Sequence, residues 1–351
     1  MKNIIIFRTD RIGDLLLSLP FIYTLKEIYK DSKITLVSSK NNSKIAKNLS
    51  IFDNVIVFPN KYLLTKILFI YTFSKSYYDL VINLDGKNRS IFSSIFINST
   101  LKISNTSKKF QEFICKSFKI DFIPDSINTN LNEIHQKIFK YINIDKKISN
   151  YDYLKTENLT TAFDDFEIND YIHLHFDEKW FYNDYIKSYT YIEPSFEELL
   201  NFLNDLSKIN NIVVTTGLNT NNIYNELIKN HFTKISDKKF IFNKNTKIFF
   251  ILNPFFNELI SISSKSKTLI TCHGAMTHVA NCFNVKIIDI IEQQKEKFYS
   301  RCTSYIKNYI PVYRSVFKKL QKNLIDKIYI FILFKALFLN IFASLIYLLT
   351  I

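Results

Sequence analysis

Short apolar runs alternate with helix-forming stretches along this chain, and the alternation occurs in two blocks. In the first block we expect strands at 3–7, 33–37, 54–58 and 79–84, and helices at 14–30 and 42–49. In the second block we expect strands at 171–176, 212–216, 246–252, 268–272 and 286–291, and helices at 195–207, 255–264 and 275–283. Strands that alternate with helices form βαβ units around a parallel sheet. The sequence therefore predicts an α/β fold with two doubly wound sheets.

A polar, weakly patterned stretch around 124–165 separates the two blocks. With 351 residues, the chain is also longer than one hydrophobic core usually supports. We therefore expect an N-terminal domain at 1–160, a second domain at 161–315, and a basic and apolar tail at 316–351.

The end of the chain differs in composition from the rest. Residues 328–351 are almost wholly apolar, and several lysines precede them. As an α-helix of about 36 Å, this segment is long enough to span a bilayer. A helix lying on the membrane surface and a helix of the protein core are the alternatives. No export signal is recognisable, so we expect a cytoplasmic protein, peripheral to or tail-anchored at the inner face of the cytoplasmic membrane.

The charge and the cysteines narrow the classes of partner. A formal net charge of +14 at pH 7 suits nucleic acid, an anionic membrane or a phosphorylated substrate. The lysines are spread along the chain, however, and the abundance of Lys, Asn and Ile is typical of AT-rich genomes, so nucleic acid is not expected. The four cysteines show no C-x-x-C spacing, which argues against a zinc knuckle or a disulfide framework and favours a reducing cytosol.

Glycine is rare here, and its positions are informative. The four glycines, Gly13, Gly86, Gly217 and Gly274, each follow an apolar strand within a few residues. Glycine permits positive φ and a close approach of the backbone to a ligand, and open α/β sheets bind ligands at the carboxyl ends of their strands. The four loops are therefore candidate binding loops, with ordinary tight turns as the alternative.

The segment RTDRIGDLLLSLP at 8–20 lies between the first strand and the first helix. It resembles the opening signature of glycosyltransferase family 9, which comprises enzymes like the ADP-heptose:lipopolysaccharide heptosyltransferases and reads R-x-D-x-x-G-D-x-x-x-x-x-P. The resemblance implies that Asp14 is the general base for the acceptor hydroxyl, and that Arg11 and Gly13 bind the acceptor. The alternative is that Asp14, or Asp10 with it, caps the following helix.

The segment YIHLHFDEKW at 171–180 resembles the strand that opens the donor-binding half of this family. The resemblance places Lys179 at the donor phosphates, where a positive charge offsets the charge of a leaving diphosphate. A solvated surface lysine is the alternative. His173 and His175 share a strand face, but no third ligand is visible, so we expect no metal site.

The segment TLITCHGAMTHVAN at 268–281 again reads as strand, glycine turn and helix. It resembles the family's D-T-G-x-x-H-x-x-A, which implies donor-binding roles for His273, Gly274 and His278. The start of a helix is a natural seat for a diphosphate. Two departures stand out: Cys272 replaces the family's acid, and one extra residue separates the glycine from the histidine.

Two weaker matches complete the resemblance. YDLVINLDGKNR at 78–89 resembles the family's Y-D-L-V-I-D-L-x-G-x-x-R, which implies that Arg89 binds an anionic acceptor through its fork of donors. Asp85 either orients the acceptor or caps a turn. The strand before Gly217 resembles one in the donor domain, with Glu226 as a possible ribose contact.

The resemblance covers residues 2–305 and implies a GT-B fold, with two Rossmann-like domains facing a cleft. It further implies an inverting glycosyltransferase that moves a sugar, expected to be heptose from ADP-heptose, to a lipopolysaccharide-core or related cell-surface glycan on a lipid. No cofactor is expected besides this co-substrate. Because G-x-G-x-x-G, Walker-type and D-x-D motifs are lacking, a metal-independent mechanism is favoured. A sugar-nucleotide epimerase of the same fold and a non-catalytic, membrane-tethered binding protein are the alternatives.

Overall fold

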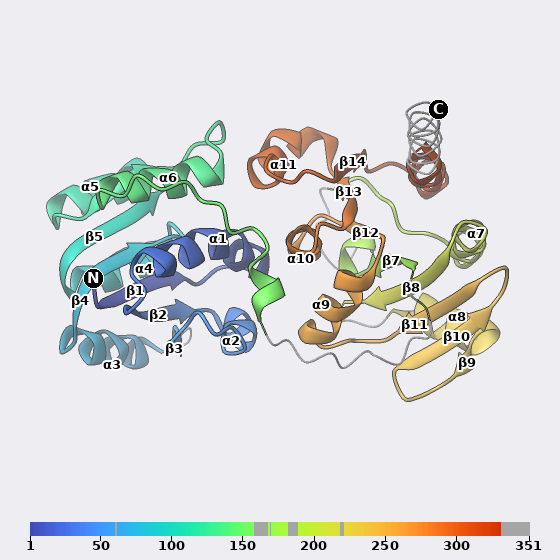
Figure 1. Ribbon diagram of the computed structural model, residues 1–351, viewed down its shortest axis with the longest axis horizontal. Helices are drawn as coiled ribbons and strands as arrows, with labels where there is room; N and C mark the ends of the chain where they lie inside the picture. Colours follow the sequence, from blue (N-terminus) through green and yellow to red (C-terminus); the bar gives the residue numbers. More distant parts are fainter. Residues whose placement is uncertain (60–61, 158–167, 169, 182–188, 218–220, 331–351) are drawn as a thin grey trace, which may run out of the picture. The chain divides into compact units, whose positions relative to one another are not determined.

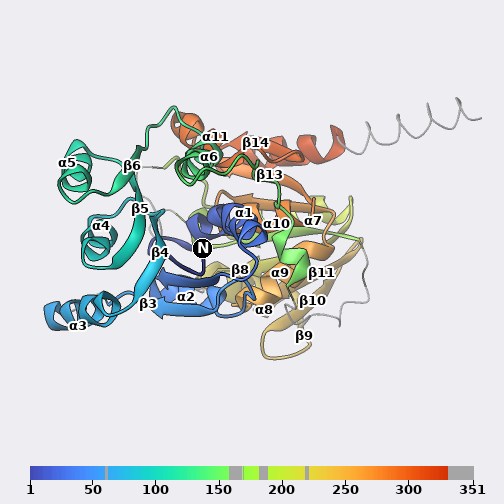
Figure 2. The same cartoon turned by 60° about the vertical axis from the view of Figure 1, so that its left-hand side comes forward.

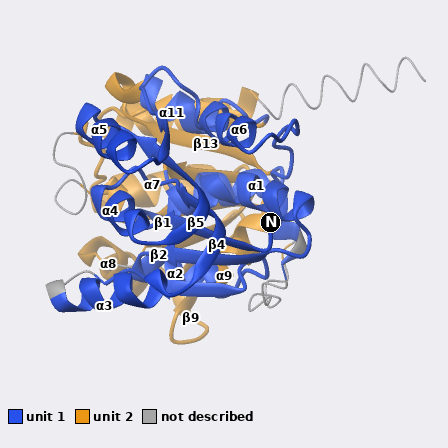
Figure 3. Ribbon diagram, turned by 90° about the vertical axis from the view of Figure 1, so that its left-hand side faces the viewer, with its two compact units in different colours: residues 1–160, 274–284, 297–307 blue, residues 161–273, 285–296, 308–351 orange. Residues whose placement is uncertain are grey.

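The protein is described from a computed structural model, which is a mixed α/β structure (Figure 1). The structure describes residues 1–59, 62–157, 168, 170–181, 189–217 and 221–330. The chain forms two compact units, each discontinuous in sequence (Figure 3). The first contains residues 1–160, 274–284 and 297–307, and the second contains residues 161–273, 285–296 and 308–351. The continuous domain limits expected from the sequence stay a prediction.

The first unit is built on a six-stranded sheet in the order β3-β2-β1-β4-β5-β6, with all neighbours parallel. The strands are β1 (Asn3–Arg8), β2 (Lys33–Ser38), β3 (Asn54–Val57), β4 (Tyr77–Asn83), β5 (Asn98–Thr106) and β6 (Asp121–Pro124). The central strands β1 and β4 are buried on both faces, as their continuous apolar runs predict. The two outer strands β5 and β6 were not expected, because their polar sequences lack the apolar run.

Helices cover both faces of this sheet. They are α1 (Ile12–Ile28), α2 (Lys40–Ala46), α3 (Leu63–Ser74), α4 (Asn88–Ile95), α5 (Lys109–Ser117), α6 (Leu131–Tyr141), the 3₁₀ turn η1 (Tyr153–Thr156), α10 (Ala275–Cys282) and α11 (Glu296–Thr303). Strands β1 to β3 follow one another toward one edge of the sheet, and β4 to β6 toward the other edge. Because the crossover between parallel strands is right-handed, this reversal places α1 and α2 on one face of the sheet and α3, α4 and α5 on the other. Figures 2 and 3 both show α5, α4 and α3 in one column.

The second unit contains an eight-stranded sheet in the order β14-β13-β12-β7-β8-β11-β10-β9. The strands are β7 (Tyr171–Phe176), β8 (Asn211–Thr216), β9 (Thr233–Lys234), β10 (Lys239–Asn243), β11 (Lys247–Ile251), β12 (Thr268–Cys272), β13 (Lys286–Ile291) and β14 (Tyr309–Tyr313). Strand β10 pairs antiparallel with both neighbours, while the other pairs are parallel. The helical elements are η2 (Glu178–Trp180), α7 (Phe196–Ser207), α8 (Asn222–His231), α9 (Phe256–Lys265) and η3 (Gln293–Lys295).

Residues 317–330 are helical and belong to the second unit. One side of this helix is buried in the core of that unit, through Phe317, Leu320, Leu324 and Ile328. Their spacing of three and four residues is that of a single helix face. The apolar segment expected to enter a membrane lies, from residue 331 onward, outside the described residues. Among the described residues, no helix combines the length and the apolar character that crossing a membrane requires.

Candidate functional site

Each sheet has one point where the strand order reverses, between β1 and β4 in the first unit and between β7 and β12 in the second. Ligands of open α/β sheets bind beside such points, outside the carboxyl ends of the strands. The loops that follow these four strands carry most of the residues singled out in the sequence. Topology therefore places most of the predicted residues just beyond the carboxyl ends of these four strands.

Arg8 is the buried cation at the end of β1. Its Nε donates to the backbone oxygen of Asp14 at 2.8 Å, and a terminal nitrogen donates to the carbonyl of Leu84 at 2.7 Å. Burial by itself lowers the pKa of Arg8, but the nearby carboxylates of Asp10 and Asp14 outweigh it and raise this pKa. Arg8 therefore stays charged and joins the ends of β1 and β4.

Asp10 was named only as a possible helix cap, yet it is the most perturbed carboxyl group of this loop. It lies 3.3 Å from a guanidinium nitrogen of Arg8, and its Oδ1 is buried without a hydrogen-bond partner. Burial raises the pKa of Asp10 to about 6, against the opposing effect of Arg8, and repulsion from Asp14 adds to the rise. A carboxyl group that titrates near neutral pH is suited to proton transfer.

Asp14 lies in the first turn of α1. Its Oδ2 accepts a hydrogen bond from the backbone N–H of Arg11 at 3.3 Å, and its Oδ1 lies 4.0 Å from the guanidinium of Arg8. The capping alternative is thus realised by one carboxylate oxygen. The side chain is 37% exposed, so an incoming ligand can reach it.

Asp85 and Arg89 both fasten the loop after β1 to the loop after β4. The Oδ2 of Asp85 accepts from the backbone N–H and hydroxyl of Thr9, at 3.1 and 2.6 Å, and from Ser90 at 2.7 Å. The guanidinium of Arg89 donates to the hydroxyl and carbonyl oxygens of Thr9 at 2.9 and 2.6 Å. These bonds favour the turn-forming alternative for Asp85, and acceptor binding by both residues stays a prediction.

Gly13 brings the first and third sequence motifs together within the first unit. A Cβ at Gly13 would lie 3.6 Å from the backbone nitrogen of Ala275, the first residue of α10. The start of α1 therefore approaches the start of α10, whose N-cap is Gly274. His278, on α10, is buried, and its Nδ1 lies 3.1 Å from the hydroxyl of Tyr305.

In the second unit, Lys179 lies just after β7 and is mostly buried. Its Nζ lies 2.6 Å from the Oδ2 of Asp177 and 3.4 Å from the carbonyl oxygen of Cys272, at the end of β12. Trp180 anchors the turn, since it is fully buried and its Nε1 donates to the carbonyl of His175 at 3.1 Å. The ammonium group is therefore held at the switch point between β7 and β12.

Arg314 is a second cation at this point, and no sequence motif pointed to it. It follows β14 and donates to the carbonyls of Lys179 and Thr190 at 2.8 and 3.1 Å. Another of its nitrogens lies 3.6 Å from the Sγ of Cys272. Burial raises the pKa of Cys272 to about 12, so the residue that replaces the family's acid is a neutral thiol.

His273 is oriented by a carboxylate that was also missed. Its Nδ1 lies 2.6 Å from the Oδ2 of Asp289, a fully buried residue of β13, and the hydroxyl of Tyr309 donates to the same oxygen at 3.0 Å. A carboxylate at one ring nitrogen fixes the tautomer and the ring plane. The contact with Asp289 therefore orients the ring of His273.

His173 and His175 share one hydrogen-bond partner, a threonine hydroxyl on the neighbouring strand. Ring nitrogens of both lie within 2.9 Å of the hydroxyl oxygen of Thr215 on β8. Burial lowers the pKa of His175 to about 4, partly offset by Asp177, and it also holds the pKa of His173 well below its usual value. Both are neutral at pH 7. Among the described residues, no cluster of three or more potential ligands is suited to a metal ion.

Gly217 is closely surrounded by side chains, whereas Glu226 is exposed. A Cβ at Gly217 would lie 2.1 Å from the Oε2 of Glu178, so a larger residue here would displace the carboxylate of Glu178. Glu226 is exposed on α8, and no described contact connects it with Lys179 or Arg314. Both remain predicted donor contacts.

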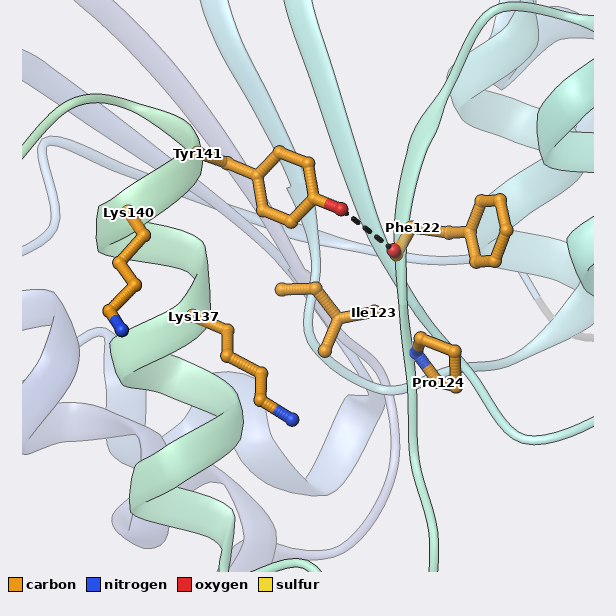
Figure 4. A pocket seen from close by; sticks show the side chains of 6 residues that line it. All are labelled: Phe122, Ile123, Pro124, Lys137, Lys140 and Tyr141. Carbon is orange, nitrogen blue, oxygen red and sulfur yellow. Dashed lines mark hydrogen bonds between the residues drawn. The ribbon is translucent and has the colours of Figure 1, made fainter.

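Two surface cavities formed by described residues lie elsewhere in the first unit. One cavity of about 310 Å³ lies between β6 and α6 (Figure 4) and is lined by Phe122, Ile123, Pro124, Lys137, Lys140 and Tyr141. A second, of about 530 Å³, adjoins the end of α5 and is lined by Lys116, Lys119, Ile120, Asp121, Phe122, Pro124 and Tyr141. None of the residues predicted for catalysis or binding lines either cavity.

Solved structures share this arrangement of sheets. A glycosyl transferase of family 9 from Veillonella parvula DSM 2008 superimposes with a TM-score of 0.64, at 14% identity, over 90% of this chain and 87% of its own. The E. coli heptosyltransferase WaaC, solved with ADP, gives 0.66 at 12% identity over 94% and 98%. The chain has the GT-B fold. The predicted fold class, and the resemblance to family 9, are thereby confirmed at the level of structure.

A further neighbour belongs to a different enzyme class. The UDP-GlcNAc 2-epimerase from Methanocaldococcus jannaschii gives a TM-score of 0.52 at 14% identity, over 92% of each chain. No protein-family model and no curated protein matches the sequence. At these identities the comparisons establish the fold, and the chemistry has to be argued from the residues.

Proposed function

We propose that this protein is an inverting glycosyltransferase that moves a sugar from a nucleotide-diphosphate donor to a cell-surface glycan. The observation that carries the proposal is the contact of Gly13 with the start of α10. It brings a loop with a reachable carboxylate, Asp14, beside a helix N-terminus, which is suited to a diphosphate. A transferase needs both groups, one for the nucleophile and one for the leaving group.

The proposed roles follow from the geometry of each group. Asp14 takes the proton of the acceptor hydroxyl as the new glycosidic bond forms, and Asp10 is the nearby carboxyl group that titrates near neutral pH. Lys179 and Arg314 bind the donor phosphates and offset the negative charge that develops as the bond to the sugar breaks. With protein cations in this role, no metal ion is required.

The donor and acceptor are proposed from the resemblance to family 9. We propose ADP-heptose as the donor, and a lipopolysaccharide-core or related glycan on a lipid as the acceptor. The structural similarity to WaaC, which was solved with ADP, supports an adenine nucleotide. The replacement of the family's acid by Cys272 is the feature that most directly questions this donor.

The proposal is tested by turnover. Purified full-length protein is incubated with ADP-heptose and a core-glycan acceptor, and transfer is followed by mass spectrometry, with the anomeric configuration read by NMR. Asp14→Asn is expected to lower kcat by at least about a hundredfold, because the general base is lost. Asp31→Asn, an exposed carboxylate elsewhere in the same unit, is the matched control and retains wild-type kcat.

Three results would contradict the assignment. Isomerisation of a nucleotide sugar without any acceptor would show an epimerase, the second candidate that shares this fold. Full turnover in the Asp14→Asn variant would show that Asp14 only caps α1. Failure of every nucleotide sugar to raise the melting temperature would favour a binding protein without catalysis.

A further inference from the structure

The outer surface of the first unit carries an unusual number of exposed apolar side chains. They lie on or directly beside α3, α4 and α5, the three helices that cover one face of the sheet (Figure 2), with one more at the start of β4. The exposed members are Tyr62, Leu64, Ile67, Leu68, Tyr71, Tyr77, Phe92, Phe96, Phe110, Phe113 and Phe118. Single exposed apolar residues are ordinary, but a set of this size on adjacent helices marks an interaction surface. We call these residues the α3–α5 face.

Helix α3 shows the pattern most clearly. Leu64, Ile67, Leu68 and Tyr71 follow the spacing of one helix face, and each is more than half exposed. The opposite side of α3 packs inward, where Phe73 is buried in a core cluster with Phe69 against it. A helix that is apolar on all sides is normally buried, so the outer stripe of α3 lacks its partner.

Helices α4 and α5 divide in the same way. Ile91 and Cys115 are buried against the sheet, whereas Phe92, Phe110 and Phe113 point away from this core and are exposed. The fold of the first unit is therefore complete without these rings. Conserving the fold does not require aromatic residues at these positions.

The charged side chains around the face are mostly lysines, which indicates an anionic partner. Within 62–77, 92–96 and 108–119 there are six lysines, Lys66, Lys75, Lys108, Lys109, Lys116 and Lys119, and one acid, Glu112. The whole chain has 46 basic and 32 acidic side chains, so codon bias toward lysine does not explain the near absence of acids here. At the edge of the face, Lys116 and Lys119 also line the cavity beside β6, together with Asp121.

We propose that the α3–α5 face docks on an anionic lipid bilayer. Aromatic and aliphatic side chains flanked by lysines are the composition of surfaces that insert shallowly between headgroups. A second copy of the chain is the less suitable occupant, because a symmetric contact would bring six lysines against six lysines. The proposal concerns a surface distinct from the residues assigned to transfer, so it does not depend on the proposed reaction.

The first test places a polarity-sensitive fluorophore on the face of the full-length protein. The described cysteines are all buried, so a labelled Leu68→Cys reports on its own position. Ile235→Cys is the matched control, because Ile235 and Leu68 are both 54% exposed and Ile235 lies in the second unit. Vesicles of phosphatidylglycerol with phosphatidylcholine are expected to shift the emission of the Leu68 label to the blue, and salt to weaken the shift. Pure phosphatidylcholine vesicles and the Ile235 label give no shift.

The second test measures binding itself. The double variant Ile67→Glu with Leu68→Glu is expected to bind phosphatidylglycerol vesicles about tenfold more weakly in cosedimentation, because it removes two apolar anchors and adds like charge to the lipid. Ile235→Glu binds as the wild type does. All variants keep residues 331–351, so any contribution of that apolar segment is the same in each. Circular dichroism and thermal shift by a nucleotide sugar check that the variants are folded.

Two outcomes would overturn the proposal. An unchanged Leu68 label on anionic vesicles would show that the face does not meet lipid. A blue shift that appears with protein concentration alone, together with a dimer in sedimentation, would identify a second copy as the occupant. Neither outcome depends on nucleotide-sugar binding or on turnover. The docking proposal and the proposed transferase activity can therefore be rejected independently of each other.

Discussion

Two carboxyl groups of one loop differ in their surroundings and therefore in their chemistry. Asp14 is partly exposed and caps α1 through one oxygen, whereas Asp10 is largely buried beside Arg8. The sequence motif identified this loop and its position between β1 and α1. It did not indicate which acid is perturbed, because Asp10 lies beside Arg8, and the guanidinium of Arg8 is held by the carbonyl of Leu84 from a distant part of the chain.

The first residue-scale prediction concerns pH. The pKa of Asp10 is raised to about 6 in the folded state from 3.8, so the folded protein binds the proton more tightly than the unfolded chain does. This contribution to the free energy of unfolding is present below pH 4 and is lost as pH rises toward 7. Asparagine does not titrate, so the Asp10→Asn variant does not lose this contribution as pH rises. The difference in melting temperature between the variant and the wild type is therefore expected to change in favour of the variant from pH 5 to pH 8. A difference that stays constant over this range would contradict the raised pKa.

The second residue-scale prediction concerns the turn after β8. Gly217→Ala is expected to lower the free energy of unfolding by about 1 kcal/mol, because the new Cβ displaces the carboxylate of Glu178 from its position. Adding Glu178→Ala removes the colliding group and should recover most of the loss. Chemical denaturation of the single and double variants measures the coupling. Equal losses in Gly217→Ala with and without Glu178 would locate the strain elsewhere.

Some residues of the candidate site lie beyond the reach of sequence reasoning. Arg314 meets the turn at Lys179 across 135 positions of the chain, and Asp289 meets His273 across 16. Neither follows a glycine or lies in a motif of the family. Only the parallel pairing of β13 with β12 and β14 brings them to the ends of the strands where the motifs lie.

At the scale of elements, the strands were easiest to predict where they are buried on both faces. The runs at β1, β4, β7 and β12 are continuous and apolar, and the structure confirms them. The short and polar strands β6 and β9 carry no such run, because an edge strand packs only part of its surface. Periodicity therefore predicts the centre of each sheet better than its margins.

The contact between α1 and α10 gives an element-scale prediction. Gly13→Ala is expected to be tolerated, because its Cβ would make an ordinary contact at 3.6 Å with the backbone of Ala275. Gly13→Leu has no room there, and it should lower the free energy of unfolding by about 1–3 kcal/mol and reduce transfer. Denaturation and kcat/KM are measured on both variants. Wild-type behaviour of Gly13→Leu would show that the two helices separate without consequence.

At the scale of the whole molecule, the discontinuity of the units has a direct consequence for stability. Helices α10 and α11 belong to the first unit, and α1 is buried along most of its length. A fragment of residues 1–160 would expose the side of α1 that packs on α10. We expect this fragment to unfold without a cooperative thermal transition, and to exchange the amide protons of α1 rapidly. A sharp transition for the fragment alone would show that the first 160 residues suffice.

The chain passes between the units after residues 160, 273, 284, 296 and 307. During translation, the first half of the protein emerges well before the helices that complete it. A nascent chain paused before residue 274 leaves the apolar surface of α1 uncovered, where a ribosome-bound chaperone can reach it. Completion of the first unit therefore waits for the last quarter of the chain, and slow synthesis there would prolong the exposure.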